Sequence, residues 1–163
     1  MIKARSEARK IALQVMYQVE LVGVPVGEAL PPVLSFVPAP LKRKRDYALR
    51  LVRAVLDRRE ELDAELRRFV TAGWNYDRLG LLERIILRMA AVEISSFEDV
   101  PCRVSIDEAV ELSKTFIGPD AGRLINGILH RYASEKDPAG LESPAPATAA
   151  AGETADASGP ERG

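Results

Sequence analysis

The most continuous helical pattern in the chain lies between Leu81 and Ile94. At about 100° per residue, the apolar side chains of this segment cover most of the helix circumference, so we expect it to pack against other helices on several sides. Arg84 and Arg88, four residues apart, share the one strip that we expect to be exposed. Glu93 projects among the apolar side chains, and we expect it to be a buried carboxylate with a partner, because an unpaired one would be costly. The pattern predicts the central helix of a helical protein.

Amphipathic helical spacing also appears on both sides of this segment. It predicts helices over about 2–22, 41–71 with a break near 57–61, 105–117 and 120–135. Pro31 and Pro32 interrupt residues 23–40, where we expect only a short or kinked helix. Ser105 and Glu108 have the spacing of a capping box, and Asp120 is placed to cap the last helix.

These elements predict an all-α fold of about seven helices in two packed helical subdomains, with a disordered C-terminal tail. We expect one domain over residues 1–136, with subdomains of about 1–73 and 74–136. In residues 137–163, Ala, Pro, Gly, Ser and Thr account for 20 of 27 residues and no aromatic occurs. Such a segment buries too little apolar surface to offset its ordering entropy, which predicts disorder.

The net charge of −1 hides an uneven distribution along the chain. Residues 1–70 hold 14 Lys and Arg against 9 Asp and Glu, whereas residues 137–163 hold 1 against 5. A basic first half favours a polyanionic partner. Arg5 and Arg9 flank the apolar face of the first helix on one side, and Lys3, Lys10 and Tyr17 flank it on the other. They fit either a solvated polar face or a phosphate-binding helix with a ring for base stacking.

The basic run at 42–45 has the same two interpretations, a solvated turn or a second nucleic-acid patch, and the solvated turn is favoured.

The sequence gives little sign of a catalytic site: the chain has one Cys, one His and no phosphate-binding glycine loop. We therefore expect no enzyme, no metal site and no cofactor. No apolar run is long enough to span a membrane, and the N-terminus lacks a secretory signal, which favours the cytoplasm.

The C-terminal half carries a spaced motif that resembles the signature of the NusB family of bacterial transcription antitermination proteins. The matching positions are Trp74, Arg78, Leu79, Glu83, Arg84, Ile86, Leu87, Arg88, Ala90, Glu93 and Ile94, then Asp99-Val100-Pro101, Val104, Ile106 to Lys114, Asp120 and Leu124 to Leu129. The first helix, through Arg5, Arg9, Ala12, Gln14 and Tyr17, resembles the basic first helix of the family. The resemblance covers residues 3–134.

The resemblance implies a factor that binds the boxA element of nascent ribosomal RNA together with NusE, a small-subunit ribosomal protein. Other Nus factors and RNA polymerase are then indirect partners. Carried over residue by residue, it assigns RNA contacts to Lys3, Arg5, Arg9, Lys10, Tyr17, Lys114, Asp120 and Arg123. It assigns NusE contact to Glu83, and Arg84 borders the same surface. The family pattern lacks Pro31-Pro32 and the 42–45 run, so the surface near these residues is not covered by it.

Two other functions stay open. One is a helical protein–protein adaptor without RNA binding. The other is the NusB-like RNA-binding module that precedes a methyltransferase in ribosomal RNA cytosine-methylating enzymes, against which the absence of a cofactor-binding domain argues. Binding of boxA RNA with and without NusE separates these functions.

Overall fold

The computed structural model describes residues 2–35 and 42–142, and these form helices and connecting turns without a strand. Eight α-helices occur in the described part: α1 (Ile2–Val22), α2 (Val26–Ser35), α3 (Lys42–Asp57), α4 (Arg59–Arg67), α5 (Leu81–Ser96), α6 (Cys102–Phe116), α7 (Pro119–Lys136) and α8 (Pro138–Glu142). A 3₁₀ turn, Tyr76–Arg78, precedes α5. The predicted all-α fold is confirmed, as is the helix break between 57 and 61.

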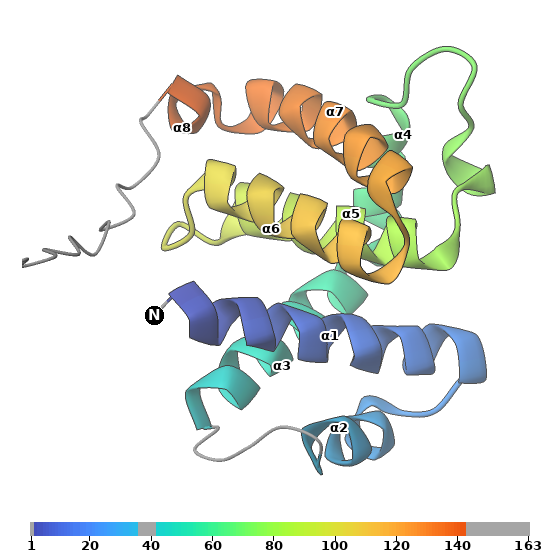
Figure 1. Ribbon diagram of the computed structural model, residues 1–163, viewed down its shortest axis with the longest axis vertical. Coiled ribbons are helices and arrows are strands. Elements are labelled where there is room, and N and C mark those ends of the chain that lie inside the picture. The colour runs from blue at the N-terminus through green and yellow to red at the C-terminus, as the bar shows by residue number, and fades with distance from the viewer. Residues whose placement is uncertain (1, 36–41, 143–163) are drawn as a thin grey trace, which may run out of the picture.

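The central helix is α5, as the sequence predicts. It packs against α1, α3, α4, α6 and α7. Its nine residues from Ile85 to Glu93 are all buried. Figure 1 shows α1, α2 and α3 in the lower part of the molecule, with α6, α7 and α8 in the upper part. The boundary predicted between subdomains at residues 73 and 74 stays a prediction.

Two charged residues of α5 are buried because other helices supply partners. Glu93 is 1% exposed and accepts from Arg9 Nε at 2.8 Å and from the Tyr47 hydroxyl at 2.5 Å. This confirms the predicted buried, paired carboxylate. Arg88 was expected on an exposed strip, but it is 3% exposed. Its guanidinium contacts both carboxylate oxygens of Asp63, at 2.6 and 2.9 Å, and those of Glu20, at 2.9 and 3.0 Å.

The exposed strip predicted for α5 is therefore wrong at Arg88. The sequence within one helix does not reveal that Asp63 of α4 and Glu20 of α1 lie across from it. Charges buried in this way are held by their partners rather than by water. Arg84 is half-buried, and its Nε is buried with no hydrogen-bond partner among the described residues.

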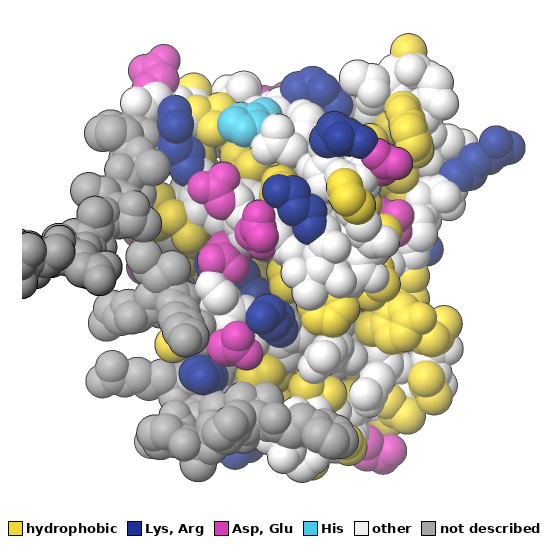
Figure 2. Space-filling view, in the orientation of Figure 1, with side chains coloured by type: hydrophobic (Ala, Val, Ile, Leu, Met, Phe, Trp, Pro, Cys, Tyr) yellow, Lys and Arg dark blue, Asp and Glu magenta, His cyan; other side chains and the backbone are white. Residues whose placement is uncertain are grey.

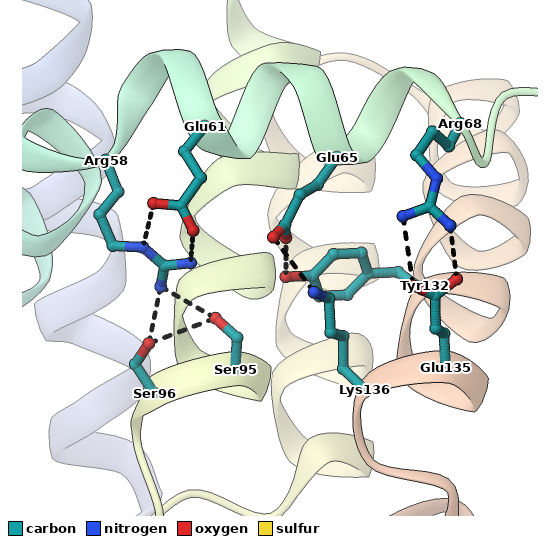
Figure 3. Close-up of polar contacts among 9 residues, drawn as sticks. All are labelled: Arg58, Glu61, Glu65, Arg68, Ser95, Ser96, Tyr132, Glu135 and Lys136. Carbon is teal, nitrogen blue, oxygen red and sulfur yellow. Dashed lines mark hydrogen bonds and ion pairs between the residues drawn. The ribbon is translucent and has the colours of Figure 1, made fainter.

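Polar contacts join α4 to α5 and α7 at the molecular surface (Figure 3). Arg58 donates to Ser96 at 2.7 Å and Ser95 at 3.1 Å, at the end of α5. Glu65 accepts from the hydroxyl of Tyr132 at 2.8 Å and from Lys136 at 3.1 Å, both on α7. These contacts fix α4 against the core through side chains that remain partly hydrated.

The starts of α6 and α7 differ from the predicted caps. Helix α6 begins at Cys102 after Pro101, so Ser105 lies inside the helix, buried. Glu108 does not reach back to Ser105, because Ser6 of α1 donates to it at 2.7 Å. A tertiary contact thus replaces the predicted capping box. Helix α7 is preceded by Gly118, whose φ of 151° favours glycine, and Asp120 lies within the first turn instead of capping it.

The proline pair and the tail also differ in part from prediction. Helix α2 has the predicted short length, but it continues through Pro31 and Pro32 to Ser35. Of the predicted tail, residues 138–142 form α8, and Leu141 accepts a hydrogen bond from Arg103 of α6 at 2.6 Å. The disorder predicted for 143–163 lies outside the described residues. No described helix is long and apolar enough to cross a membrane.

Candidate nucleic-acid interface

The residues predicted to contact RNA lie in three places rather than in one. Arg5 is at the N-terminal end of α1, next to the loop between α5 and α6. Lys10 and Tyr17 lie further along α1. Lys114, Asp120 and Arg123 lie around the turn between α6 and α7, which is at the opposite end of α1 from Arg5 in Figure 1. Twelve residues separate Arg5 from Tyr17, which is about 18 Å along a helix.

Lys10 and Tyr17 occupy one partly exposed strip of α1. They are seven residues apart, two helical turns, so their side chains point the same way. Lys10 pairs with Glu7 at 3.3 Å, and both side chains are exposed enough for water or a phosphate to compete. We call this the Lys10–Tyr17 strip. The side chain of Lys3 lies outside what the structure describes, as do those of Lys42 and Arg43.

Arg9 does not belong to this surface. It is 2% exposed, and its guanidinium lies in the core between Glu93 and the Tyr47 ring, 5.6 Å from the ring centroid. Burial alone would lower the pKa of Arg9, but the attraction of Glu93, Tyr47 and Glu108 together with the hydrogen bond to Glu93 outweighs it, and the pKa is raised. Burial and then Glu93 also raise the pKa of Tyr47 above its usual range. The expectation that Arg9 contacts phosphates is corrected: its placement makes it a partner of Glu93.

Tyr17 lines a hollow of about 470 Å³ where α1, α2, α5 and α6 meet. Its walls include Leu13, Pro32, Leu82 and Phe116. We call it the Tyr17 groove. In Figure 2, hydrophobic side chains gather on the right of the molecule, where the C-terminal end of α1 and the turn between α6 and α7 lie in Figure 1. Tyr17, which is partly buried against the core, therefore borders an apolar hollow.

A second hollow, of about 680 Å³, brings predicted RNA and partner residues together. Glu83 borders it from the first turn of α5, and Asp120 and Arg123 border it from α7. Trp74 and Ile117 also line it, and they remain 59% and 38% exposed. We call it the Trp74 groove. Exposed large apolar side chains in a concave surface are typical of a protein-binding site.

Charge in the Trp74 groove is mixed. Asp120 and Arg123 form an ion pair with each other, and both side chains are mostly exposed. Lys114 pairs with Glu111 at 3.4 Å on the solvent side of α6. Burial does not hold these pairs, so a charged partner can exchange for either member. Among the described residues, no group of three or more His, Cys, Asp or Glu side chains is arranged to hold a metal ion.

Sequence reasoning missed three residues beside Arg5. Asp99 accepts from Arg5 at 2.7 Å and from Arg50 of α3 at 3.3 Å, and the Arg50 guanidinium lies 3.8 Å from the centroid of the Phe97 ring. Arg50 falls on the polar side of α3, where periodicity alone cannot tell a functional cation from a solvated one. Only the fold brings α1, α3 and the loop after α5 together.

Comparison with known proteins identifies the family. The model of the NusB family matches residues 6–134. The chain belongs to the NusB family. Two similar relatives are the transcription antitermination proteins NusB of Symbiobacterium thermophilum, 38% identical over 77% of this chain and 86% of that protein, and of Pelotomaculum thermopropionicum, 40% identical over 78% and 88%.

Solved structures agree with this family assignment. A NusB structure from T. maritima has a TM-score of 0.74 and 27% identity, covering 85% of this chain and 97% of that one. A crystal structure of the antitermination factors NusB and NusE in complex with double-stranded RNA has a TM-score of 0.74 and 27% identity, covering 83% and 99%. Both relatives are transcription antitermination proteins, in agreement with the expectation from the sequence.

Proposed function

We propose that this NusB-family chain is a transcription antitermination factor that binds the boxA element of nascent ribosomal RNA together with NusE. The observation that supports it most is the family match, which spans residues 6–134 and therefore most of the helices that carry the candidate interface, with Lys3 and Arg5 just before it. Other Nus factors and RNA polymerase would be reached indirectly through this complex. Its place of action is then the cytoplasm, where transcription occurs.

RNA, in this proposal, follows α1 from Arg5 past Lys10 to Tyr17 and on toward Lys114 and Arg123. The three places lie too far apart for one nucleotide, so a single strand of several nucleotides must span them. The cations contribute affinity that does not depend on sequence, whereas Tyr17 offers a ring face to one base. Lys3 belongs to this track by its sequence position, although its side chain is outside the described part.

NusE, in this proposal, docks on the Trp74 groove. The groove offers an apolar centre in Trp74 and Ile117, and a charged rim in Glu83, Arg78 and Arg123. An apolar centre with a polar rim is the usual anatomy of a protein interface. Arg84, the residue that follows Glu83 in α5, is half-buried, and we place it at the edge of the proposed NusE surface. The groove adjoins the residues at which the RNA track ends, so one partner can contact both.

The track is tested by measuring the affinity of boxA RNA for variants of the Lys10–Tyr17 strip across a range of salt concentrations. Lys10→Ala should weaken binding and lower the slope of log K against log salt by about 0.7, the value for one phosphate contact on a single strand. Tyr17→Ala should weaken binding by about 1–3 kcal/mol through lost stacking and leave the slope unchanged.

Arg59→Ala serves as the matched control, because Arg59 is an exposed arginine at the start of α4 outside the three candidate places. It should bind like the unchanged protein. Equal losses in Lys10→Ala and Arg59→Ala would mean that the strip is not the RNA track. NusE binding without any RNA binding would favour the adaptor function, for which the apolar Trp74 groove is the supporting observation.

A further inference from the structure

The N-terminal end of α1 carries an arrangement that the proposed function does not explain. Asp99, in the loop between α5 and α6, lies between two arginines from different helices. Arg5 of α1 donates from Nη2 to Oδ2 at 2.7 Å and from Nη1 to the backbone carbonyl of Asp99 at 3.1 Å. Arg50 of α3 donates from Nη1 to the other carboxylate oxygen at 3.3 Å. One anion thus bridges two guanidinium groups.

Two aromatic rings hold these guanidinium groups independently of Asp99. Arg50 lies over the Phe97 ring at 3.8 Å from its centroid, and Arg5 lies over the Tyr47 ring at 5.0 Å. The rings are buried, and they contact each other edge to face with centroids 6.0 Å apart. Arginine stacks well on aromatic faces, so the two cations stay side by side when the carboxylate moves away.

The contacts of Asp99 are open to solvent. The side chains of Arg5, Arg50 and Asp99 are 36%, 48% and 46% exposed. Ion pairs this exposed add little to the stability of a fold. Although burial acts in the opposite direction, attraction by Arg50 and Arg5 lowers the pKa of the Asp99 carboxyl, which keeps it ionised at neutral pH. A phosphate of RNA can therefore compete with the Asp99 carboxylate for the guanidinium groups of Arg5 and Arg50.

We propose that Arg5 and Arg50 form a phosphate subsite for RNA, which Asp99 occupies in the free protein and leaves when RNA binds. A carboxylate and a phosphodiester each present two oxygens that share one negative charge, and both accept paired hydrogen bonds from arginine. Asp99 is then an internal competitor of RNA. This inference rests on the proposed function, to which it adds Arg50 and a restraint on RNA affinity.

The subsite also gives the basic residues of α3 a place in RNA binding. Helix α3 carries six Lys and Arg against two Asp, and it packs directly on α1. Arg50 lies on its exposed side, as do Arg45 and Arg53. A strand that enters the Arg5–Arg50 subsite passes along this basic side of α3 before it follows α1. The sequence alone does not distinguish between a solvated turn and a nucleic-acid patch at the basic start of α3, and the proposed subsite favours the patch.

The test compares RNA affinity of Asp99→Asn with that of the unchanged chain, by fluorescence anisotropy with labelled boxA RNA in the presence and absence of NusE. Asparagine keeps the shape of the side chain and removes its charge. Affinity should rise about fivefold, the strength of a favourable exposed ion pair. The slope of log K against log salt should change little, because the same phosphate occupies the subsite when RNA is bound to either chain.

Two further variants separate the subsite from a general change in charge. Glu98→Gln removes the same charge from the neighbouring exposed position, which forms no ion pair with another described residue, and it should raise affinity less than twofold. Arg50→Ala should weaken binding. In the Arg50→Ala background, Asp99→Asn should gain less than twofold. Melting temperatures within error of the unchanged chain show that the fold is kept.

The outcomes separate this inference from the function on which it rests. If the chain binds boxA RNA but Asp99→Asn binds no better than Glu98→Gln, the subsite is overturned and the proposed function stands. A gain from Asp99→Asn that survives intact in the Arg50→Ala background also overturns it. If no variant binds RNA with or without NusE, both proposals fail.

Discussion

Arg9 shows that a basic residue expected to bind RNA can instead have a structural role in the core. From its position among other bases it was expected on the RNA surface, whereas the structure places it in the core with Glu93. Sequence periodicity does indicate that Glu93 is buried, because it projects among apolar side chains of α5. It does not indicate the partner, which comes from a helix 84 residues away along the chain. Long-range pairing of this kind is the part of the fold that local patterns cannot supply.

Arg9→Ala should therefore lower the free energy of unfolding by about 3–5 kcal/mol, because it leaves the buried carboxylate of Glu93 without its cation. Urea denaturation followed by circular dichroism measures this loss. Replacing both members, Arg9→Met with Glu93→Met, should recover most of it, since apolar pairs of similar volume often substitute for buried ion pairs. Equal stability of Arg9→Ala and the unchanged chain would contradict the structural role of Arg9.

At the scale of elements, α8 covers the single cysteine of the chain. Cys102 is 1% exposed at the start of α6, and Arg103, the next residue, donates to the Leu141 carbonyl of α8. Burial, followed by the nearby Asp137, raises the pKa of the Cys102 thiol. The thiolate is the reactive form, so both exposure and ionisation oppose reaction. Composition predicted only disorder here, because a helix of five residues leaves almost no periodic signal.

Cys102 should accordingly react with a thiol reagent such as Ellman's reagent far more slowly in the folded chain than in urea. Truncation after Asp137 removes α8 and should speed the reaction of the folded protein by at least tenfold. Truncation after Glu142, the matched control, keeps α8 and should leave the rate unchanged. The role assigned to α8 fails if the two truncated chains react at the same rate.

The Trp74 groove is also built from several elements. Glu83 comes from α5, Ile117 from the turn after α6, and Trp74 from the connection before the 3₁₀ turn. The sequence places Glu83 in the first turn of a helix, where a favourable interaction with the helix dipole is sufficient to explain it. The apolar surroundings that favour a protein partner appear only when the three elements are brought together.

Glu83→Lys should weaken NusE binding by at least tenfold, because it reverses a charge on the rim of the groove, and it should leave the helical circular dichroism unchanged. Glu60→Lys, an equal charge reversal at an exposed position of α4, is the control and should bind NusE normally. Isothermal titration calorimetry measures both. Unchanged affinity of Glu83→Lys would remove this residue from the interface.

At the scale of the whole molecule, the fold class, the central helix and most helix boundaries follow from hydrophobic periodicity. The arrangement of the candidate interface does not. Lys10 and Tyr17 share a strip because they are seven residues apart, which the sequence indicates. That Lys114 and Arg123 lie at the far end of α1 from Arg5 depends on how α6 and α7 pack against α5. The RNA residues proposed from the sequence thus form an extended track rather than one pocket.

Titration of labelled boxA RNA with the full chain, in the presence and absence of NusE and at two salt concentrations, is the most direct test of RNA binding together with NusE. Binding should be measurable, weaken steeply with salt and become tighter in the presence of NusE, and a scrambled RNA of equal length should bind less well. Binding that is insensitive to salt and to NusE, or no binding under any of these conditions, would contradict it.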